Sequence, residues 1–137
     1  MKKFPFITQQ IALNLLRIST SLFLAAHGFI RLYAGTVSGF GDFLNSKGFL
    51  VGTGIAWGLT FFEILGGLLM AIGFFRKVIS AVFILQLIFG IVLVHAQNGW
   101  FVVGYQSGGM EYSVLLILSL IVIAASGTNK SSVNKDL

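Results

Sequence analysis

Residues 51–74 have the sequence VGTGIAWGLTFFEILGGLLMAIGF, in which Glu63 is the only charged side chain. A helix needs about 20 predominantly apolar residues to cross the hydrocarbon core of a bilayer, and this stretch is long enough. Lys47 precedes it and Arg76 follows it, so charged residues lie on both sides. The stretch therefore predicts a membrane-spanning helix that carries one carboxylate at membrane depth.

The rest of the chain has the same apolar character. Of its 137 residues, 56% are hydrophobic and 9% are charged, whereas soluble domains contain roughly 25% charged residues. Hydropathy predicts four helices, at about 8–33, 51–74, 78–96 and 110–126. A glycine-rich loop from Gly35 to Leu50, through Gly39 and Gly41, and a polar tail over 128–137 complete the chain. The predicted fold class is all-α: one membrane domain, residues 1–137, forming an antiparallel up-and-down four-helix transmembrane bundle.

The basic residues predict the orientation of these spans. The side that holds both termini carries six of them: Lys2, Lys3, Arg76, Lys77, Lys130 and Lys135. The opposite side has Lys47, with Arg31 at its boundary. By the positive-inside rule, both termini are expected to be cytoplasmic. A cleaved signal peptide is disfavoured because Arg17 interrupts the first apolar segment.

Four glycines of the second predicted span point to close helix packing. Gly54 and Gly58 form a GxxxG motif, and Gly66 and Gly67 follow in the same helix. Small residues let helix backbones approach each other in lipid. Packing within the bundle is the favoured use, and a homo-oligomer interface is the alternative.

Polar residues of the first predicted span share one helical side: Asn14, Arg17, Thr20, Ser21, His27, Gly28 and Arg31. This side is expected to face the other helices, because lipid leaves polar groups unsatisfied. Helical rise places Arg17 about 8 Å and Glu63 about 16 Å from the cytoplasmic boundary, within side-chain reach of each other. We therefore predict an Arg17–Glu63 ion pair, with helix docking as its main use and direct function as the alternative.

A second polar group is predicted near the outer leaflet. His27, Arg31, His95 and Glu111 come to similar depth, and Tyr112 adds a phenolic hydroxyl. Histidines pass protons near neutral pH, and a carboxylate is favoured at a helix N-terminus. These five residues form a candidate ligand pocket for a polar headgroup such as a quinone ring.

Structural roles are an alternative for the same region. Trp100, Phe101 and Tyr105 have the character of an interfacial aromatic belt. Gln86 and His95 lie about 180° apart on a regular helix, so only one of them can face the bundle axis.

Composition and spacing exclude several kinds of chemistry. The chain has no cysteine, which excludes disulfides, thiol chemistry and cysteine-ligated metals. No metal site is predicted, because the two histidines and the glutamates lack ligand spacing. The basic residues are scattered between apolar segments, so the formal charge of +5 does not indicate nucleic acid as a partner.

The order of these residues resembles the DoxX family over about residues 13–123. The matching positions are Arg17, His27, Gly28, Arg31, Glu63, Gly66, Gly67, Gly73, Arg76, His95 and the run from Gly108 to Tyr112. The Glu-x-x-Gly-Gly and Gly-Gly-x-Glu-Tyr elements are the most specific parts. Arg31 stands where the family often has lysine, which keeps the charge and changes the hydrogen-bonding geometry.

The resemblance implies a four-helix protein of the bacterial inner membrane, related to the small subunit of thiosulfate:quinone oxidoreductase. It thereby implies a multi-pass subunit that supports a membrane oxidoreductase system, with quinone as the candidate ligand. The bilayer and the proteins of a membrane complex are the expected partners. Because the chain has no residue that carries electrons, we do not expect it to be catalytic alone. The alternative is a structural or assembly subunit of a larger envelope complex.

Overall fold

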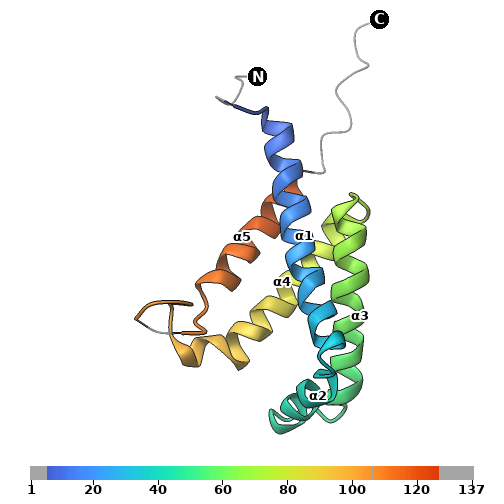
Figure 1. The fold of residues 1–137 in the computed structure, drawn as a ribbon, viewed down its shortest axis with the longest axis vertical. Coiled ribbons are helices and arrows are strands. Elements are labelled where there is room, and N and C mark those ends of the chain that lie inside the picture. The colour runs from blue at the N-terminus through green and yellow to red at the C-terminus, as the bar shows by residue number, and fades with distance from the viewer. Residues whose placement is uncertain (1–5, 106, 127–137) are drawn as a thin grey trace, which may run out of the picture. The chain divides into compact units, whose positions relative to one another are not determined.

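The computed structural model describes residues 6–105 and 107–126, and the regular elements in that part of the chain are all helical. In order they are α1 (Gln9–Tyr33), α2 (Val37–Ser46), α3 (Gly52–Ala71), α4 (Arg76–Leu93), the 3-10 helix η1 (His95–Asn98) and α5 (Glu111–Ala125) (Figure 1). Three of these, α1, α3 and α4, are long and apolar enough to cross a membrane, and α5 is a shorter apolar helix. The all-α class is thus confirmed.

The chain divides into two compact units. The α1–α3 unit comprises Ile18–Phe74, and the α4–α5 unit comprises Met1–Arg17 together with Phe75–Leu137. Each unit is described by itself. The four-helix bundle, the single membrane domain and the cytoplasmic termini therefore stay predictions. Part of the basis for the predicted orientation lies outside the described residues, namely Lys2, Lys3, Lys130, Lys135 and the tail over 128–137.

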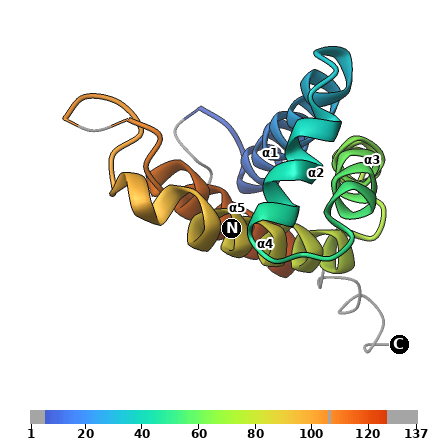
Figure 2. The ribbon, with the colours of Figure 1, turned by 90° about the horizontal axis from the view of Figure 1, so that it is seen from below.

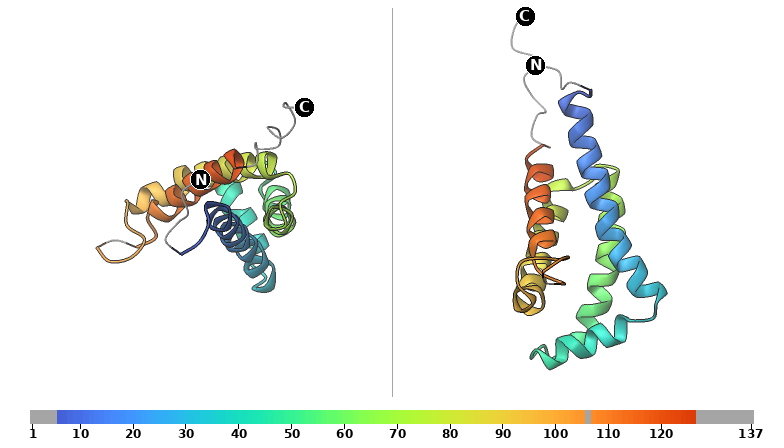
Figure 3. Two further views of the ribbon diagram at one scale, coloured as in Figure 1. Left: turned by 90° about the horizontal axis from the view of Figure 1, so that it is seen from above. Right: turned by 60° about the vertical axis from the view of Figure 1, so that its left-hand side comes forward.

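In the α1–α3 unit, two glycines set how α1 and α3 meet. A Cβ atom on Gly28 would lie 2.7 Å from the Thr60 carbonyl oxygen and 2.8 Å from the Glu63 Cβ. A Cβ atom on Gly67 would lie 2.8 Å from the Ala25 Cβ. The two helices therefore run antiparallel and side by side, with their backbones in close approach (Figures 1 and 3).

The predicted loop after α1 is wrong, because most of it forms α2. This helix buries Val37 and Leu44 and crosses from the end of α1 to the start of α3 (Figure 2). Gly41, which was placed in the predicted loop, lies within α2. A Cβ atom there would lie 2.6 Å from the Thr53 Cα, so the absence of a side chain lets α2 pack closely on α3. The Asn45 side-chain oxygen adds a hydrogen bond by accepting the Gly52 amide at 2.8 Å.

The turn between α3 and α4 corrects two predicted boundaries. Helix α3 ends at Ala71 instead of continuing to Phe74. Gly73 has φ 96°. Its amide donates to the Met70 carbonyl oxygen, and the Phe74 amide donates to the Leu69 carbonyl oxygen. This pattern is a Schellman-type helix end, so the helix stops before the last apolar residues that hydropathy alone would include. Helix α4 then begins at Arg76.

In the α4–α5 unit, the two apolar helices pack side by side (Figure 3). Phe83 of α4 and Leu116 and Leu120 of α5 are buried. Helix α4 ends at Leu93, so His95 lies in η1 and not in the regular helix predicted to run to residue 96.

We predict that Gly28→Ala destabilises the protein, because the added methyl group has no space against Thr60 and Glu63. Overpacking of this kind costs about 1–3 kcal/mol. Unfolding by increasing concentrations of a denaturing detergent, followed by circular dichroism, measures this loss in the free energy of unfolding.

The matched controls are Gly54→Ala and Gly58→Ala. The structure shows open space around both positions within the part of the chain it describes. The free energy of unfolding is expected to stay the same or to rise by up to ~1 kcal/mol, because alanine favours helix more than glycine. Equal losses at Gly28 and Gly54 would contradict this packing.

Candidate functional site

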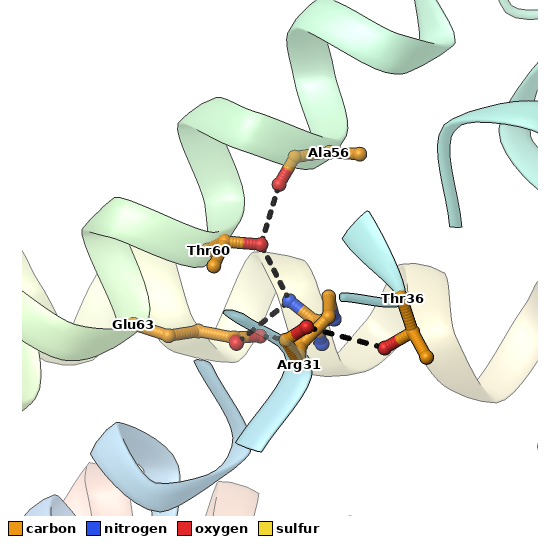
Figure 4. A network of polar contacts seen from close by, with 5 residues as sticks. All are labelled: Arg31, Thr36, Ala56, Thr60 and Glu63. Atoms are coloured by element: carbon orange, nitrogen blue, oxygen red, sulfur yellow. Dashed lines mark hydrogen bonds and ion pairs between the residues drawn. The ribbon is translucent and has the colours of Figure 1, made fainter. Parts of the chain in front are cut away.

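Arg31 and Glu63 form a buried ion pair inside the α1–α3 unit (Figure 4). Arg31 lies in the last turn of α1, where the helix dipole favours a positive charge. Its Nη1 donates to the Glu63 Oε2 at 2.8 Å, and its Nη2 donates to Oε1 at 3.3 Å. This two-point geometry is the strongest that a guanidinium and a carboxylate form.

Two neighbours complete the surroundings of the Arg31 guanidinium. The Thr60 hydroxyl donates to the Ala56 carbonyl oxygen at 2.7 Å, so its own oxygen is free to accept from Nη1 of Arg31 at 3.2 Å. From α2, the Phe40 ring lies 4.5 Å from the guanidinium carbon, a cation–π contact. Arg31 thus joins α1, α2 and α3 at one point, which we call the Arg31 junction (Arg31, Phe40, Thr60 and Glu63).

Burial makes the Arg31 junction sensitive to the loss of either charge. The Glu63 side chain is 4% exposed and that of Arg31 is 19% exposed. An ion pair with this little water costs several kcal/mol in desolvation, which the mutual attraction and the added hydrogen bonds offset. Removing Glu63 would leave the largely buried Arg31 charge without this counter-charge.

The structure gives Glu63 a partner that the sequence analysis did not predict. Its carboxylate is paired with Arg31, because contact at Gly28 brings Glu63 level with the last turns of α1. Arg17 belongs to the α4–α5 unit, so the predicted Arg17–Glu63 pair stays a prediction.

In the α4–α5 unit, Glu111 holds the aromatic loop, which comprises residues 99–105 and 107–110. Its Oε1 accepts the backbone amide of Val102 at 2.9 Å, and its own amide donates to the Trp100 carbonyl oxygen at 3.0 Å. Gly109 makes this possible, since a Cβ there would lie 2.5 Å from the Trp100 carbonyl oxygen. The Gly-Gly-x-Glu-Tyr element therefore builds a loop as well as starting α5.

His95 contacts the same loop from the other side. Its Nδ1 lies 2.8 Å from the Gly108 carbonyl oxygen. A carbonyl oxygen only accepts hydrogen bonds, so Nδ1 must carry the proton. In the neutral ring, Nε2 is then a hydrogen-bond acceptor.

The five residues of the predicted pocket belong to different units. Arg31 and His27 lie in the α1–α3 unit, and His95, Glu111 and Tyr112 lie in the α4–α5 unit. His27 is exposed, although it was expected on the inward side of α1. Relative to Gly28, the buried centre of that side, it is turned by about 100°, which takes it to the outer surface. The Tyr112 side chain is also partly exposed, at 38%.

Sequence reasoning missed two members of the Arg31 junction. Thr60 precedes Glu63 by three positions, so both lie on one face of α3, and this spacing was a usable signal. Phe40 gave no signal, because it lies in a segment predicted as a loop. Among the described residues, His, Cys, Asp and Glu form no group of three that could hold a metal ion.

Comparison with known proteins places these features in a family. The DoxX family model matches residues 12–96, which is more than half of the chain. The chain belongs to the DoxX family, and with its apolar helices it is a multi-pass membrane protein. No curated protein and no solved structure shows significant similarity to it.

We predict that Glu63→Gln destabilises the protein by roughly 3 kcal/mol, because it leaves the Arg31 charge without a counter-charge. Replacing both residues together, as Arg31→Met with Glu63→Gln, should restore much of the loss, since neither charge then remains. Detergent unfolding of the two single variants and of this double variant gives the coupling energy.

The same measurements with Arg17→Met in place of Arg31→Met test the predicted Arg17–Glu63 pair. We expect the coupling of Glu63 to Arg31 to be the larger one, because Arg31 contacts the carboxylate at two points. A coupling of Glu63 to Arg17 as large as its coupling to Arg31 would contradict this expectation.

Proposed function

We propose that this protein is a membrane subunit of an oxidoreductase system and that it binds a quinone headgroup at His95. It works as a single membrane domain in the bacterial inner membrane, with both termini cytoplasmic. Its DoxX membership supports the link to redox systems. It carries no cysteine to transfer electrons, so a partner protein supplies the redox chemistry.

The hydrogen bond of His95 is the observation that carries this proposal. Because Nδ1 donates to the Gly108 carbonyl oxygen, the ring is held in one tautomer with Nε2 as acceptor. A quinol hydroxyl is a donor that fits this acceptor. A quinone oxygen fits the protonated ring, in which both nitrogens donate.

The surface of α4 next to His95 suits an isoprenoid tail. Leu85, Phe89 and Val92 are 56%, 50% and 62% exposed and follow the i, i+4, i+7 pattern of one helical face. His95 follows in η1, two positions after α4 ends at Leu93. A tail lying along this face would lead to the end of the helix that adjoins His95.

The other predicted pocket residues have unequal parts in this proposal. Tyr112 is adjacent to Glu111 and offers a phenolic hydroxyl at the start of α5. Glu111 keeps Oε1 on the Val102 amide and so positions the loop that His95 contacts. Arg31 is engaged by Glu63, and the proposal does not draw on it or on His27.

We predict that His95→Asn abolishes quinone binding and leaves the fold intact, because the shorter amide keeps a donor near the Nδ1 position and has no group at Nε2. Adding a short-chain quinol to the wild-type protein in detergent should raise its Tm, by an amount that grows with ligand concentration. His95→Asn should show no such rise. Extraction and mass analysis of purified protein should find quinone in the wild type alone.

His95→Gln is the matched control, since its amide reaches the Nε2 position and gives up the contact with Gly108. It should retain more of the Tm rise than His95→Asn. Absence of bound quinone, together with no Tm rise in the wild type, would contradict the binding proposal.

The Arg31 junction favours a second candidate, a structural or assembly subunit of a larger envelope complex. All four of its side chains serve helix docking.

We predict that cross-linking in native membranes, followed by affinity purification, recovers oxidoreductase subunits. Recovery of envelope assembly proteins alone would favour the second candidate, and recovery of the chain itself would indicate a homo-oligomer.

A further inference from the structure

Helix α5 is too short to cross the hydrocarbon core by itself. Its 15 residues span about 22 Å, against a core thickness of about 30 Å. Its partner α4 has 18 residues and spans about 27 Å. The remaining depth must be filled by chain that adjoins the two helices.

The aromatic loop adjoins both helices and exposes apolar side chains. Val103 is 81% exposed and Tyr105 is 91% exposed, while Trp100 and Phe101 are exposed by nearly half. No Asp, Glu, Lys or Arg occurs between Lys77 and Glu111. A loop in water at the end of a span would normally carry charged residues. This one has none, and its sequence has only Gln106 and Ser107 beside its glycine, aromatic and aliphatic residues.

Backbone hydrogen bonds hold the two arms of the loop together near its base. They join Gly99 to Met110, Trp100 to Glu111, Phe101 to Gly109 and Val102 to Gly108, at 3.0–3.1 Å. Side chains add two more contacts, since Glu111 accepts the Val102 amide and His95 donates to the Gly108 carbonyl oxygen. Because the hydrocarbon core leaves unpaired backbone groups unsatisfied, this paired base suits the edge of the core and the tip suits the hydrated interface.

We propose that the aromatic loop is a lipid-binding element that lies in the interfacial region of the bilayer. Trp100 and Tyr105 are residue types that prefer this depth, where an apolar ring meets acyl chains and a polar group meets the headgroups. The loop thereby connects the short α4–α5 pair to the headgroup region. Lipid is favoured over a protein partner as its contact, because the loop connects two apolar helices, of which α4 is long enough to span a membrane, and it has no charge with which to select a partner.

Tryptophan fluorescence tests this directly, because the chain has two tryptophans. Trp57→Phe leaves Trp100 as the sole emitter, and the variant is reconstituted in phosphatidylcholine vesicles. Lipids brominated near the glycerol end of the acyl chain should quench Trp100 more than lipids brominated near the chain end. Aqueous iodide should quench it weakly.

The matched control is Trp100→Phe, which leaves Trp57 on α3 and shows that the brominated lipids reach a spanning helix. A third variant, Tyr105→Trp without the two native tryptophans, reports on the tip of the loop. It should show the same preference for shallow bromine.

Strong iodide quenching of Trp100 and of the residue 105 reporter, with no quenching by brominated lipid, would place the loop in water and overturn the proposal. Stronger quenching from the chain-end bromines than from the shallow ones would also overturn it. Neither result depends on quinone, so this proposal can fail while the proposed function stands.

Discussion

A carboxylate inside a membrane span must find a positive partner, and the pairing of Glu63 with Arg31 is the constraint on which the α1–α3 unit depends. The attraction between the two charges acts only if α1 and α3 approach closely at the right level. The Thr60 hydroxyl and the Phe40 ring then add further contacts to the guanidinium. One interaction thereby fixes the positions of three helices.

Glycine makes these approaches possible. Gly28 and Gly67 bring α1 and α3 together, Gly41 brings α2 onto α3, and Gly109 lets the aromatic loop close against the start of α5. In each case a side chain would occupy space that a neighbouring backbone or side chain already fills. Close approach matters because no hydrophobic driving force brings helices together in lipid. Tight packing and buried polar contacts must hold them together instead.

The polar groups of the α4–α5 unit serve the loop in a similar way. Glu111 accepts a loop amide, and His95 donates to a loop carbonyl oxygen. Two residues that look like reactive groups in the sequence thus have structural uses here. His95 differs from Glu111 in one respect. Its hydrogen bond to the Gly108 carbonyl oxygen puts the proton on Nδ1 and leaves Nε2 as the acceptor of the neutral ring. The loop is thereby coupled to any ligand that binds Nε2.

The sequence by itself determined that the protein is helical, apolar and built for a membrane, and that Glu63 needs a partner inside the protein. These conclusions follow from composition and from the high cost of unpaired charge in lipid, which depend little on detailed packing. Tertiary structure decided that the partner is Arg31, that α2 replaces a loop, and that Glu111 supports residues 99–102. Each of these depends on the register between segments distant in sequence. Glycine contacts and hydrogen bonds between those segments set this register, and hydropathy does not encode it.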